Sequence, residues 1–229
     1  MKKRQIKHNI LITAGPTREF IDPIRFISNP STGTIGYLLA QSAKRRGNDV
    51  VLLSGPTHLK PPPGVKTVSF NSARELKNCS DRFFDWADII ICTAAVADFR
   101  PAKVINRKIK KEKGVPEIKL VRNPDILKGL GRKKKNKVLI GFALETENLI
   151  ENGLKKLKSK NLDLIVANMH SKKSLPFGKR QVTAFLIDRE GVQKHAKTTK
   201  ERLARIILDR ADKLCYILMQ PRKKGGKLC

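Results

Sequence analysis

Five short apolar runs, separated by stretches of helical pattern, constrain the fold of this chain more than any other feature of its sequence. The runs are rich in Ile, Leu and Val, which is typical of strands that a parallel sheet buries on both faces. We expect strands at Asn9 to Thr13, Asp49 to Leu53, Asp88 to Cys92, Lys137 to Phe142 and Asp163 to Ala167. We expect helices at Thr34 to Arg46, Ser72 to about Asn78, Pro124 to Leu130 and Asn148 to Lys160.

The alternation of strand and helix predicts an α/β fold with a Rossmann-like, doubly wound, mostly parallel sheet. Near the C-terminus, two apolar alternations around a turn at Arg189 to Gly191 predict a hairpin, and a last helix is expected over Lys200 to Lys213. The hairpin strands are Gln181 to Ile187 and Val192 to Ala196. We therefore expect a single domain over residues 9–214, a basic N-terminal tail over 1–8, and a basic, disordered C-terminal tail over 215–229.

Three connections are longer than the short loops that are usual in such folds. They span Ala14 to Gly33, Ala94 to about Glu117, and His170 to Arg180, and each follows the carboxyl end of a predicted strand. Ligands bind at this edge of open α/β sheets, so the loops indicate where a site lies. The second connection contains a lysine-rich stretch, Lys103 to Lys113, which we interpret as a basic flap.

The chain carries 49 Lys and Arg residues against 20 Asp and Glu, a formal net charge of +29, which attracts polyanions. A nucleic acid binder is one interpretation of this charge. Against it, only 5% of the residues are aromatic, and no helix-turn-helix, RRM or zinc-finger motif occurs. We expect phosphate-bearing small molecules as partners and keep nucleic acid as an alternative.

The four cysteines and four histidines stand singly, without the spacing of a metal site. The apolar run after the basic N-terminus is too short for a signal peptide, and no run is long enough to cross a membrane. We therefore expect a reduced, cytoplasmic protein with no membrane contact and no metal held by a protein cage.

The first long connection contains residue types that bind anions. It reads GPTRE at 15–19 and RFISNPSTGTIG at 25–36, where N–H groups and hydroxyls precede a predicted helix. Such a helix start can hold a phosphate or carboxylate. Neither G-x-G-x-x-G nor GxxxxGK[ST] occurs, so a nicotinamide cofactor and Walker-type chemistry are not supported. An ordinary capped helix after a long connector is the alternative interpretation.

The third strand ends in small residues, TAAVADFRP at 93–101, which would let a flat ring or a ribose approach the backbone. Asp98 could accept ribose hydroxyls, hold a divalent cation beside phosphates, or cap a turn. Lys108, Lys110 and Lys111 could neutralise a triphosphate, although a solvated run of charge is an equally good interpretation.

Two later segments, NPDI at 123–126 and GFALET at 141–146, also lie at predicted strand or helix ends. Either could be structural, the first as a Pro-initiated helix with Asn123 as its cap. Lys156 and Lys160 stand four residues apart on one helical face, where they could share an anion or form a solvated edge.

Taken together, the segments GPTRE, RFISNPSTGTIG, AAVADFRP, KIKK, RNPDIL, GFALET and NLDLIVAN occur in the order and at about the spacings of phosphopantothenate-cysteine ligase. The resemblance covers about Asn9 to Lys213. In many bacteria this domain is fused behind a flavin-dependent decarboxylase. Because this chain starts at the ligase motifs, the resemblance implies a free-standing ligase without FMN, for which a separate decarboxylase is a candidate partner.

The resemblance implies a two-step ligation in coenzyme A biosynthesis. The carboxylate of 4'-phosphopantothenate attacks the α-phosphate of CTP to give an acyl-cytidylate and pyrophosphate, and the amine of L-cysteine then displaces CMP. Activation is needed because a carboxylate is a poor acyl donor. Mg²⁺ near Asp98 would share the charge of the triphosphate. The family is usually dimeric, which implies a homodimer.

The resemblance also implies site residues. Asn29 would contact the acyl carbonyl of the intermediate, Arg25 would act in its conversion, and Lys108 would stabilise charge while the cytidylate forms. Asn29, with Ser31, Thr32 and Gly33, would bind the acid substrate. The implied nucleotide contacts are Ala94, Asp98, Lys108, Pro124, Asp125, Ile126, Leu127, Phe142, Lys156 and Lys160.

Two residues, Thr93 and Leu144, depart from the family pattern and affect the expected shape of the base pocket. The choice of CTP over ATP rests on the bacterial form of the motifs. A nicotinamide-dependent oxidoreductase is the other enzymatic alternative. It would require an acidic ribose partner after the second strand, where Ser54-Gly55-Pro56 stands instead.

Overall fold

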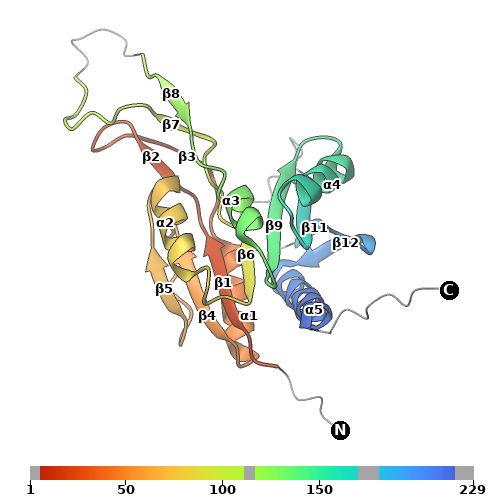
Figure 1. Cartoon of the computed structure of the whole chain (residues 1–229). Coiled ribbons are helices and arrows are strands. Elements are labelled where there is room, and N and C mark those ends of the chain that lie inside the picture. The colour runs from red at the N-terminus through yellow and green to blue at the C-terminus, as the bar shows by residue number, and fades with distance from the viewer. Residues whose placement is uncertain (1–5, 111–116, 170–180, 220–229) are drawn as a thin grey trace, which may run out of the picture.

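An eight-stranded sheet forms the centre of the structure, a computed structural model that describes residues 6–110, 117–169 and 181–219 (Figure 1). The sheet order is β12-β11-β10-β9-β6-β1-β4-β5, and only β11 and β12 run antiparallel to their neighbours. This confirms the predicted doubly wound, mostly parallel sheet with a C-terminal hairpin. The strands are β1 (Asn9–Ala14), β4 (Asp49–Ser54), β5 (Lys66–Ser69), β6 (Ile89–Cys92), β9 (Val138–Glu145), β10 (Leu164–Met169), β11 (Gln181–Asp188) and β12 (Gly191–Thr199).

The strand order reverses beside β1. From β1 the chain builds β4 and β5 outward on one side, and it then returns to build β6, β9 and β10 on the other side. Thr13 of β1 is in register with both Leu53 and Cys92, so the loops that follow these strands leave the sheet at the same level. The crevice at the carboxyl ends of β1 and β6 is the place where open sheets of this order bind ligands.

Two helical layers cover the sheet, because side chains of its buried strands alternate between the two faces. On β1, Ile10 and Ile12 pack toward α1 and α5, whereas Leu11 packs toward the other three helices. All three side chains are fully buried. The helices are α1 (Thr34–Arg45), α2 (Ala73–Phe83), α3 (Ile126–Lys133), α4 (Leu149–Ser159) and α5 (Lys200–Met219).

Local contacts explain where the elements differ from the prediction. The sequence does not predict β5, because its positions at the sheet edge are only partly buried and form no apolar run. α3 begins after Asp125 rather than at Pro124, since the Asp125 side chain accepts a bond from Lys128 N and takes the cap position predicted for Asn123. α2 continues to Phe83, past the predicted end near Asn78.

The described structure extends past both predicted tail boundaries. α5 continues to Met219, past the predicted end at Lys213, and Cys215 is buried in the core. His8 is also buried, and its N–H donates to Asn48 Oδ1 at 2.9 Å, so it belongs to the domain. Residues 1–5 and 220–229 lie outside the described part. Within the described part, no helix is both long and apolar enough to cross a membrane.

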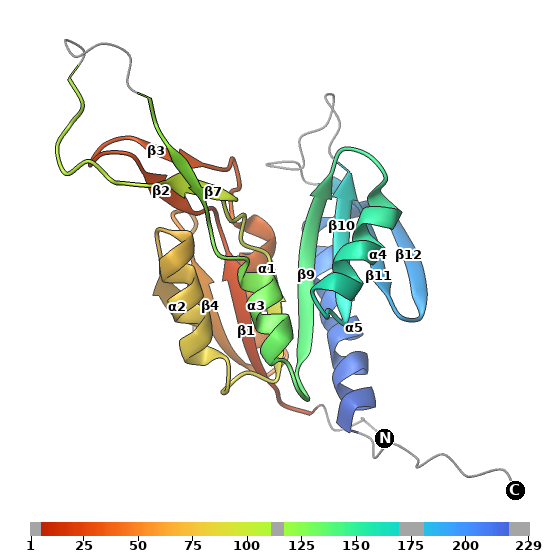
Figure 2. The same cartoon turned by 45° about the horizontal axis from the view of Figure 1, so that its top comes forward.

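Two short antiparallel strand pairs extend beyond the carboxyl edge of the sheet (Figures 1 and 2). β2 (Arg18–Phe20) pairs with β3 (Phe26–Ser28), and β7 (Phe99–Pro101) pairs with β8 (Leu120–Arg122). We call these two strand pairs, with the β2–β3 turn at residues 21–25 and with residues 102–110, the arm. The predicted flap lies on the arm as far as Lys110, and its remainder lies outside the described residues, as does the connection predicted over His170 to Arg180.

Gly36 lets α1 lie directly against the sheet beneath the ligand edge. A Cβ at Gly36 would lie 2.5 Å from Ala14 Cβ and 2.6 Å from Thr93 Oγ1. We therefore expect Gly36→Ala to destabilise the fold by about 1–3 kcal/mol, measured by urea unfolding. Gly129 of α3 is the control, because a Cβ at this position would meet nothing within 4 Å. Gly129→Ala should stabilise the fold by about 0.5–1 kcal/mol, and equal effects of the two changes would contradict the tight contact at Gly36.

Candidate active site

Two cavities adjoin at the carboxyl ends of β6 and β9. The first cavity has a volume of about 450 Å³ and the second about 350 Å³. Both volumes lie in the range of small-molecule sites. The cavities share one wall, formed by Ala94, Ala95 and Val96 after β6 and by Phe142, Ala143 and Leu144 of β9. The two cavities are therefore adjacent, and ligands bound in them would lie side by side along these shared residues.

Hydrogen bonds fix the backbone of the shared wall to the connection that follows β1. Ala95 N donates to Gly15 O at 2.9 Å, and Ala97 N donates to Thr17 Oγ1 at 3.0 Å. Gly15 has a φ of 81°, a conformation that favours glycine. The GPTRE and AAVAD segments thus form one cross-linked unit, which holds the wall in place before any ligand binds.

The N-terminal end of α1 opens into the first cavity. Its cap residue, Gly33, has a φ of 75°, and in the described residues no side chain caps the helix and no acidic residue stands in its first turn. The first-turn N–H groups and the helix dipole therefore favour an anion here. Ser31 and Thr32, predicted to bind the substrate, line the same cavity.

Asn29 lies on the first cavity and is held by the shared wall. Its Nδ2 donates to Ala95 O at 3.1 Å, and its side chain is partly buried. An amide group has two N–H donors, so this bond orients the group and leaves a second donor for a ligand. Thr93 also lines the first cavity, and its hydroxyl donates to Thr13 O at 2.7 Å, whereas Leu144 lines both cavities.

The second cavity collects most of the residues predicted to bind a nucleotide. Asn123 Nδ2 donates to Ala97 O at 2.8 Å, which fixes the start of the α3 segment against the shared wall. All the predicted nucleotide residues except Lys108 line this cavity: Ala94, Asp98, Pro124, Asp125, Ile126, Leu127, Phe142, Lys156 and Lys160.

Lys156 and Lys160 reach the second cavity from the C-terminal part of α4, and each is paired with a carboxylate. Lys156 Nζ lies 2.5 Å from Glu145 Oε1, and Lys160 Nζ lies 2.9 Å from Asp125 Oδ2. Burial raises the pKa of Asp125, but the Lys128 N–H and the Lys160 ammonium outweigh this and lower it. The four-residue spacing thus places two ammonium groups on one cavity, where a polyphosphate would add to or exchange with their carboxylate partners.

Cys92 also lines the second cavity, at the end of β6. Burial raises the pKa of its thiol to about 12, although Lys160 opposes the shift. The thiol is therefore neutral at physiological pH and is a poor nucleophile. Covalent chemistry through Cys92 is not favoured, and bond formation is expected between the ligands themselves.

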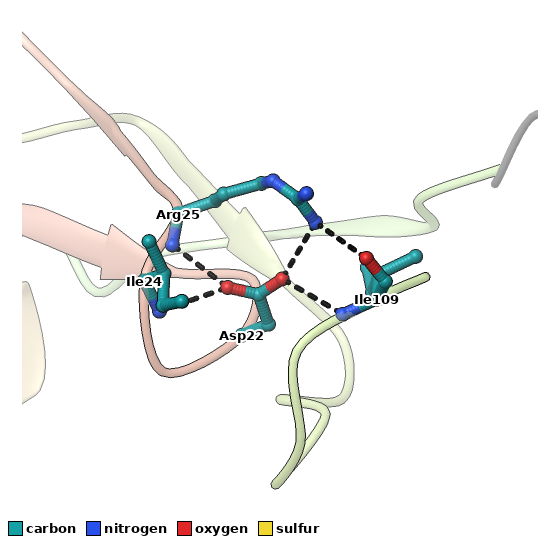
Figure 3. Close-up of polar contacts among 4 residues, drawn as sticks. All are labelled: Asp22, Ile24, Arg25 and Ile109. Atoms are coloured by element: carbon teal, nitrogen blue, oxygen red, sulfur yellow. Dashed lines mark hydrogen bonds and ion pairs between the residues drawn. The ribbon is translucent and has the colours of Figure 1, made fainter. Parts of the chain in front are cut away.

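Arg25 and Lys108 lie on the arm and are not among the residues that line the two cavities. Arg25 Nη1 donates to Asp22 Oδ2 at 2.8 Å and to Ile109 O at 3.3 Å (Figure 3). Lys108, which precedes Ile109, is exposed. The structure therefore brings these two predicted catalytic residues close to each other in the arm and away from the cavities.

The buried carboxylate of Asp22 connects the β2–β3 turn with residue 109 of the arm. It accepts bonds from Ile24 N and Arg25 N at 2.8 Å and from Ile109 N at 3.2 Å (Figure 3). Burial raises its pKa, but these N–H groups and the Arg25 charge outweigh burial, and the pKa falls to about 2. The carboxylate therefore stays ionised and holds the base of the flap at every physiological pH.

Some motif residues are structural, and some residues that line the cavities belong to no motif. Glu19 of GPTRE is buried, and its Oε1 accepts a bond from Ala73 N at 3.0 Å at the start of α2. Val182 and Lys200 line the first cavity, yet they follow the last motif, and nothing in the sequence pattern brings them to the site.

A divalent cation at this site would have to be held mainly by a bound phosphate compound rather than by protein side chains. In the described part of the chain, no three His, Cys, Asp or Glu side chains are grouped closely enough to hold a metal ion. Asp98 and Asp125 both line the second cavity, and Asp125 already pairs with Lys160, so these residues would fit an Mg²⁺ ion only if phosphate oxygens supplied most of its ligands.

Residues 6–214 match the model of the family described as DNA/pantothenate metabolism flavoprotein, C-terminal domain. The chain belongs to this family. The resemblance inferred from the seven motifs is therefore confirmed at the level of the family, and the match covers the whole of the region in which the motifs occur.

Several curated relatives of this family member are bifunctional proteins of coenzyme A biosynthesis. The chain is 50% identical over 163 residues to the coenzyme A biosynthesis bifunctional protein CoaBC of Bacillus subtilis (strain 168), covering 71% of this chain and 40% of that protein. It is 42% identical over 209 residues to CoaBC of Escherichia coli (strain K12), covering 89% of this chain and 52% of that protein. The chain thus spans about half the length of these relatives or less.

Solved structures share the fold of this family member. The crystal structure of the C-terminal domain of CoaBC matches with a TM-score of 0.80 at 39% identity, covering 94% of this chain and 100% of that chain. A structure of the Cab2 mutant H337A in complex with phosphopantothenate-cysteine matches with a TM-score of 0.75 at 17% identity, covering 93% of this chain and 89% of that chain.

Proposed function

We propose that this domain ligates 4'-phosphopantothenate to L-cysteine through an acyl-cytidylate, using CTP and releasing pyrophosphate and CMP. The observation that carries the proposal is the shared wall between two cavities of small-molecule size. One cavity holds the predicted nucleotide residues, and the other holds Asn29 with Ser31, Thr32 and Gly33. Relatives that function in coenzyme A biosynthesis support the assignment.

In this proposal CTP occupies the second cavity. Lys156 and Lys160 bind its phosphates, and the small side chains of the shared wall allow the base and ribose to approach the backbone. Mg²⁺, when bound with Asp98 and Asp125, supplies neutralisation of the triphosphate charge. The neutral Cys92 thiol contributes to the floor of the cavity and takes no part in bond formation.

The acid substrate occupies the first cavity, with its phosphate toward the N-terminal end of α1 and its carboxylate at the shared wall. In the first step a carboxylate oxygen bonds to the α-phosphorus, and the bond to pyrophosphate breaks. In the second step the cysteine nitrogen bonds to the acyl carbon and loses a proton, while CMP leaves with the electron pair of the broken C–O bond. The free N–H of Asn29 stabilises the charge that develops on the acyl oxygen.

In this proposal the arm carries Arg25 and Lys108 to the bound nucleotide. They can act on a bound triphosphate when the arm of the same chain closes over it, or when the arm of a second copy does so in a homodimer. Asp22 gives both arrangements the same starting point, because it fixes Arg25 and Ile109 to each other. A cytoplasmic location, the absence of FMN and a separate decarboxylase partner remain predictions.

Pyrophosphate release tests the proposed function. We expect release that requires 4'-phosphopantothenate and Mg²⁺, and CMP formation that requires L-cysteine as well. With saturating acid, turnover with CTP should exceed turnover with ATP. Faster turnover with ATP would overturn the choice of base, and no release with either nucleotide would overturn the ligase assignment.

The same preparation tests the nucleic acid alternative. A binder would show only salt-sensitive affinity for RNA and no pyrophosphate release. A small part of the positive charge has another explanation, because basic residues occupy the last turns of several helices, where they complement the helix dipole. Examples are Lys44 and Arg45 of α1, and Arg132 and Lys133 of α3.

A further inference from the structure

Lys200 is the only charged residue among the described residues that line the first cavity. It is the first residue of α5, and Leu203 of the same helix lines the cavity beside it. It belongs to none of the seven motifs that indicate the family. A single cation in an otherwise uncharged cavity is a strong determinant of which ligand can enter.

The ammonium group of Lys200 has no anionic partner in the described residues, where none of the ion pairs includes it. Its side chain is partly buried, and burial lowers its pKa, although Glu201 opposes the shift. Lys156 and Lys160 differ in this respect, since each is paired with a carboxylate. A partly desolvated cation without a counterion is stabilised when an anion binds beside it.

A second positive feature faces the same space. α1 and α5 pack against each other, and the N-terminal end of α1, from Gly33 to Ile35, lines the cavity together with Lys200. The uncapped N–H groups of α1 and the ammonium of α5 therefore both act on one cavity of about 450 Å³. Together they match a group with two negative charges, such as a phosphate monoester, better than a single carboxylate.

Asn168 gives an independent indication that a polar ligand belongs in this cavity. It lines the cavity from β10, and among the described residues its buried Oδ1 has no hydrogen-bond partner. A buried acceptor without a partner is costly, so a ligand that brings an N–H or O–H donor would be favoured. The acid of the proposed reaction carries both features, a phosphate and hydroxyl or amide donors.

We propose that Lys200 binds the phosphate of the acid substrate and so selects the phosphorylated acid over its unphosphorylated form. This inference rests on the proposed function and adds to it a specificity residue outside the motifs. Lys200 would not touch the reacting carboxylate, which lies at the shared wall. Its loss should therefore affect binding of the acid more than the chemical steps.

Replacement of Lys200 tests the proposal. We expect Lys200→Met to raise the KM for 4'-phosphopantothenate by about 10- to 100-fold, since a hydrogen bond to a charged group is lost. The KM for CTP and the kcat should change little, and discrimination against unphosphorylated pantothenate should fall by a similar factor. Lys200→Arg should restore most of the affinity. Arg202→Met is the matched control, because Arg202 is an exposed cation on the same helix and does not line the cavity.

Calorimetric titration of 4'-phosphopantothenate into each variant gives a second readout, and circular dichroism shows whether each variant is folded. An unchanged KM and affinity in folded Lys200→Met would overturn the inference, as would a loss confined to kcat. If Lys200→Met fails to fold, Lys200→Gln is measured in the same way. Failure of the proposed function is distinguishable from failure of this inference, because in that case the wild-type chain itself releases no pyrophosphate.

Discussion

Asn29→Asp is expected to release pyrophosphate in a single turnover at close to the wild-type rate, while overall turnover falls by about 10²- to 10³-fold. The amide of Asn29 donates to Ala95 O at 3.1 Å and keeps a second N–H for the acyl oxygen. A carboxylate at this position has no N–H to donate, and it would repel both the Ala95 carbonyl oxygen and the acyl oxygen of the intermediate. The acyl-cytidylate should therefore accumulate, which mass spectrometry of the quenched reaction would detect.

A matched change in the other cavity separates the two steps. Asn123 Nδ2 donates to Ala97 O at 2.8 Å, so it is held as Asn29 is, but it lines the nucleotide side of the shared wall. Asn123→Asp should slow pyrophosphate release and should leave no accumulated intermediate. If Asn29→Asp turned over normally, or if both variants gave the same pattern, Asn29 would have no specific role in the second step.

The central sheet could be predicted from sequence because its parallel strands are buried on both faces. Ile89 to Ile91 of β6 have almost no exposed surface, and such strands appear as unbroken apolar runs. The same rule fails for β5 at the sheet edge and for short arm strands such as β3, where every residue is exposed or only partly buried. Those elements depend on contacts between distant segments, such as Phe99 with Arg122, which no local pattern shows.

The convergence of most predicted nucleotide residues on one cavity could also be predicted, because these residues follow strand ends that meet at one edge of the sheet. Asp98, Asp125 and Lys160 lie far apart in sequence, yet all line the second cavity. Lys200 and Asn168 could not be predicted as a pair. They come together with α1 only because the antiparallel hairpin returns the chain to the first cavity, and this path depends on tertiary packing.

The ion pairs of the second cavity explain how it can tolerate two lysines before a nucleotide binds. Glu145 and Asp125 neutralise Lys156 and Lys160, which limits repulsion between the two ammonium groups in the free protein. The first cavity lacks such a pair at Lys200 among its described lining residues. In the proposed reaction, a multiply charged nucleotide would add to or exchange with these carboxylates, whereas the acid would meet a cation that has no anionic partner among the described residues.

Lys108→Gln is expected to reduce pyrophosphate release by about 10²-fold or more, because a cation directed at charge that develops on the phosphates is lost. Ile109 N donates to Asp22 Oδ2 at 3.2 Å, so the backbone next to Lys108 is anchored while its exposed side chain is free to reach a ligand. Lys103→Gln is the control, since Lys103 is an exposed lysine of the same arm. The measurement is a single-turnover assay with saturating CTP. Equal rates for the two variants would make Lys108 an ordinary surface residue.

Mixtures of variants then show which chain's arm supplies Lys108. In a mixed dimer of Lys108→Gln and Asn29→Asp, one cavity set keeps Asn29 and one arm keeps Lys108. If the arm acts on the partner's cavities, the intact Asn29 of one chain and the intact Lys108 of the other chain combine in one site. The mixture then regains turnover that neither variant has alone. If the arm closes over its own chain, every site lacks one of the two residues and no activity returns.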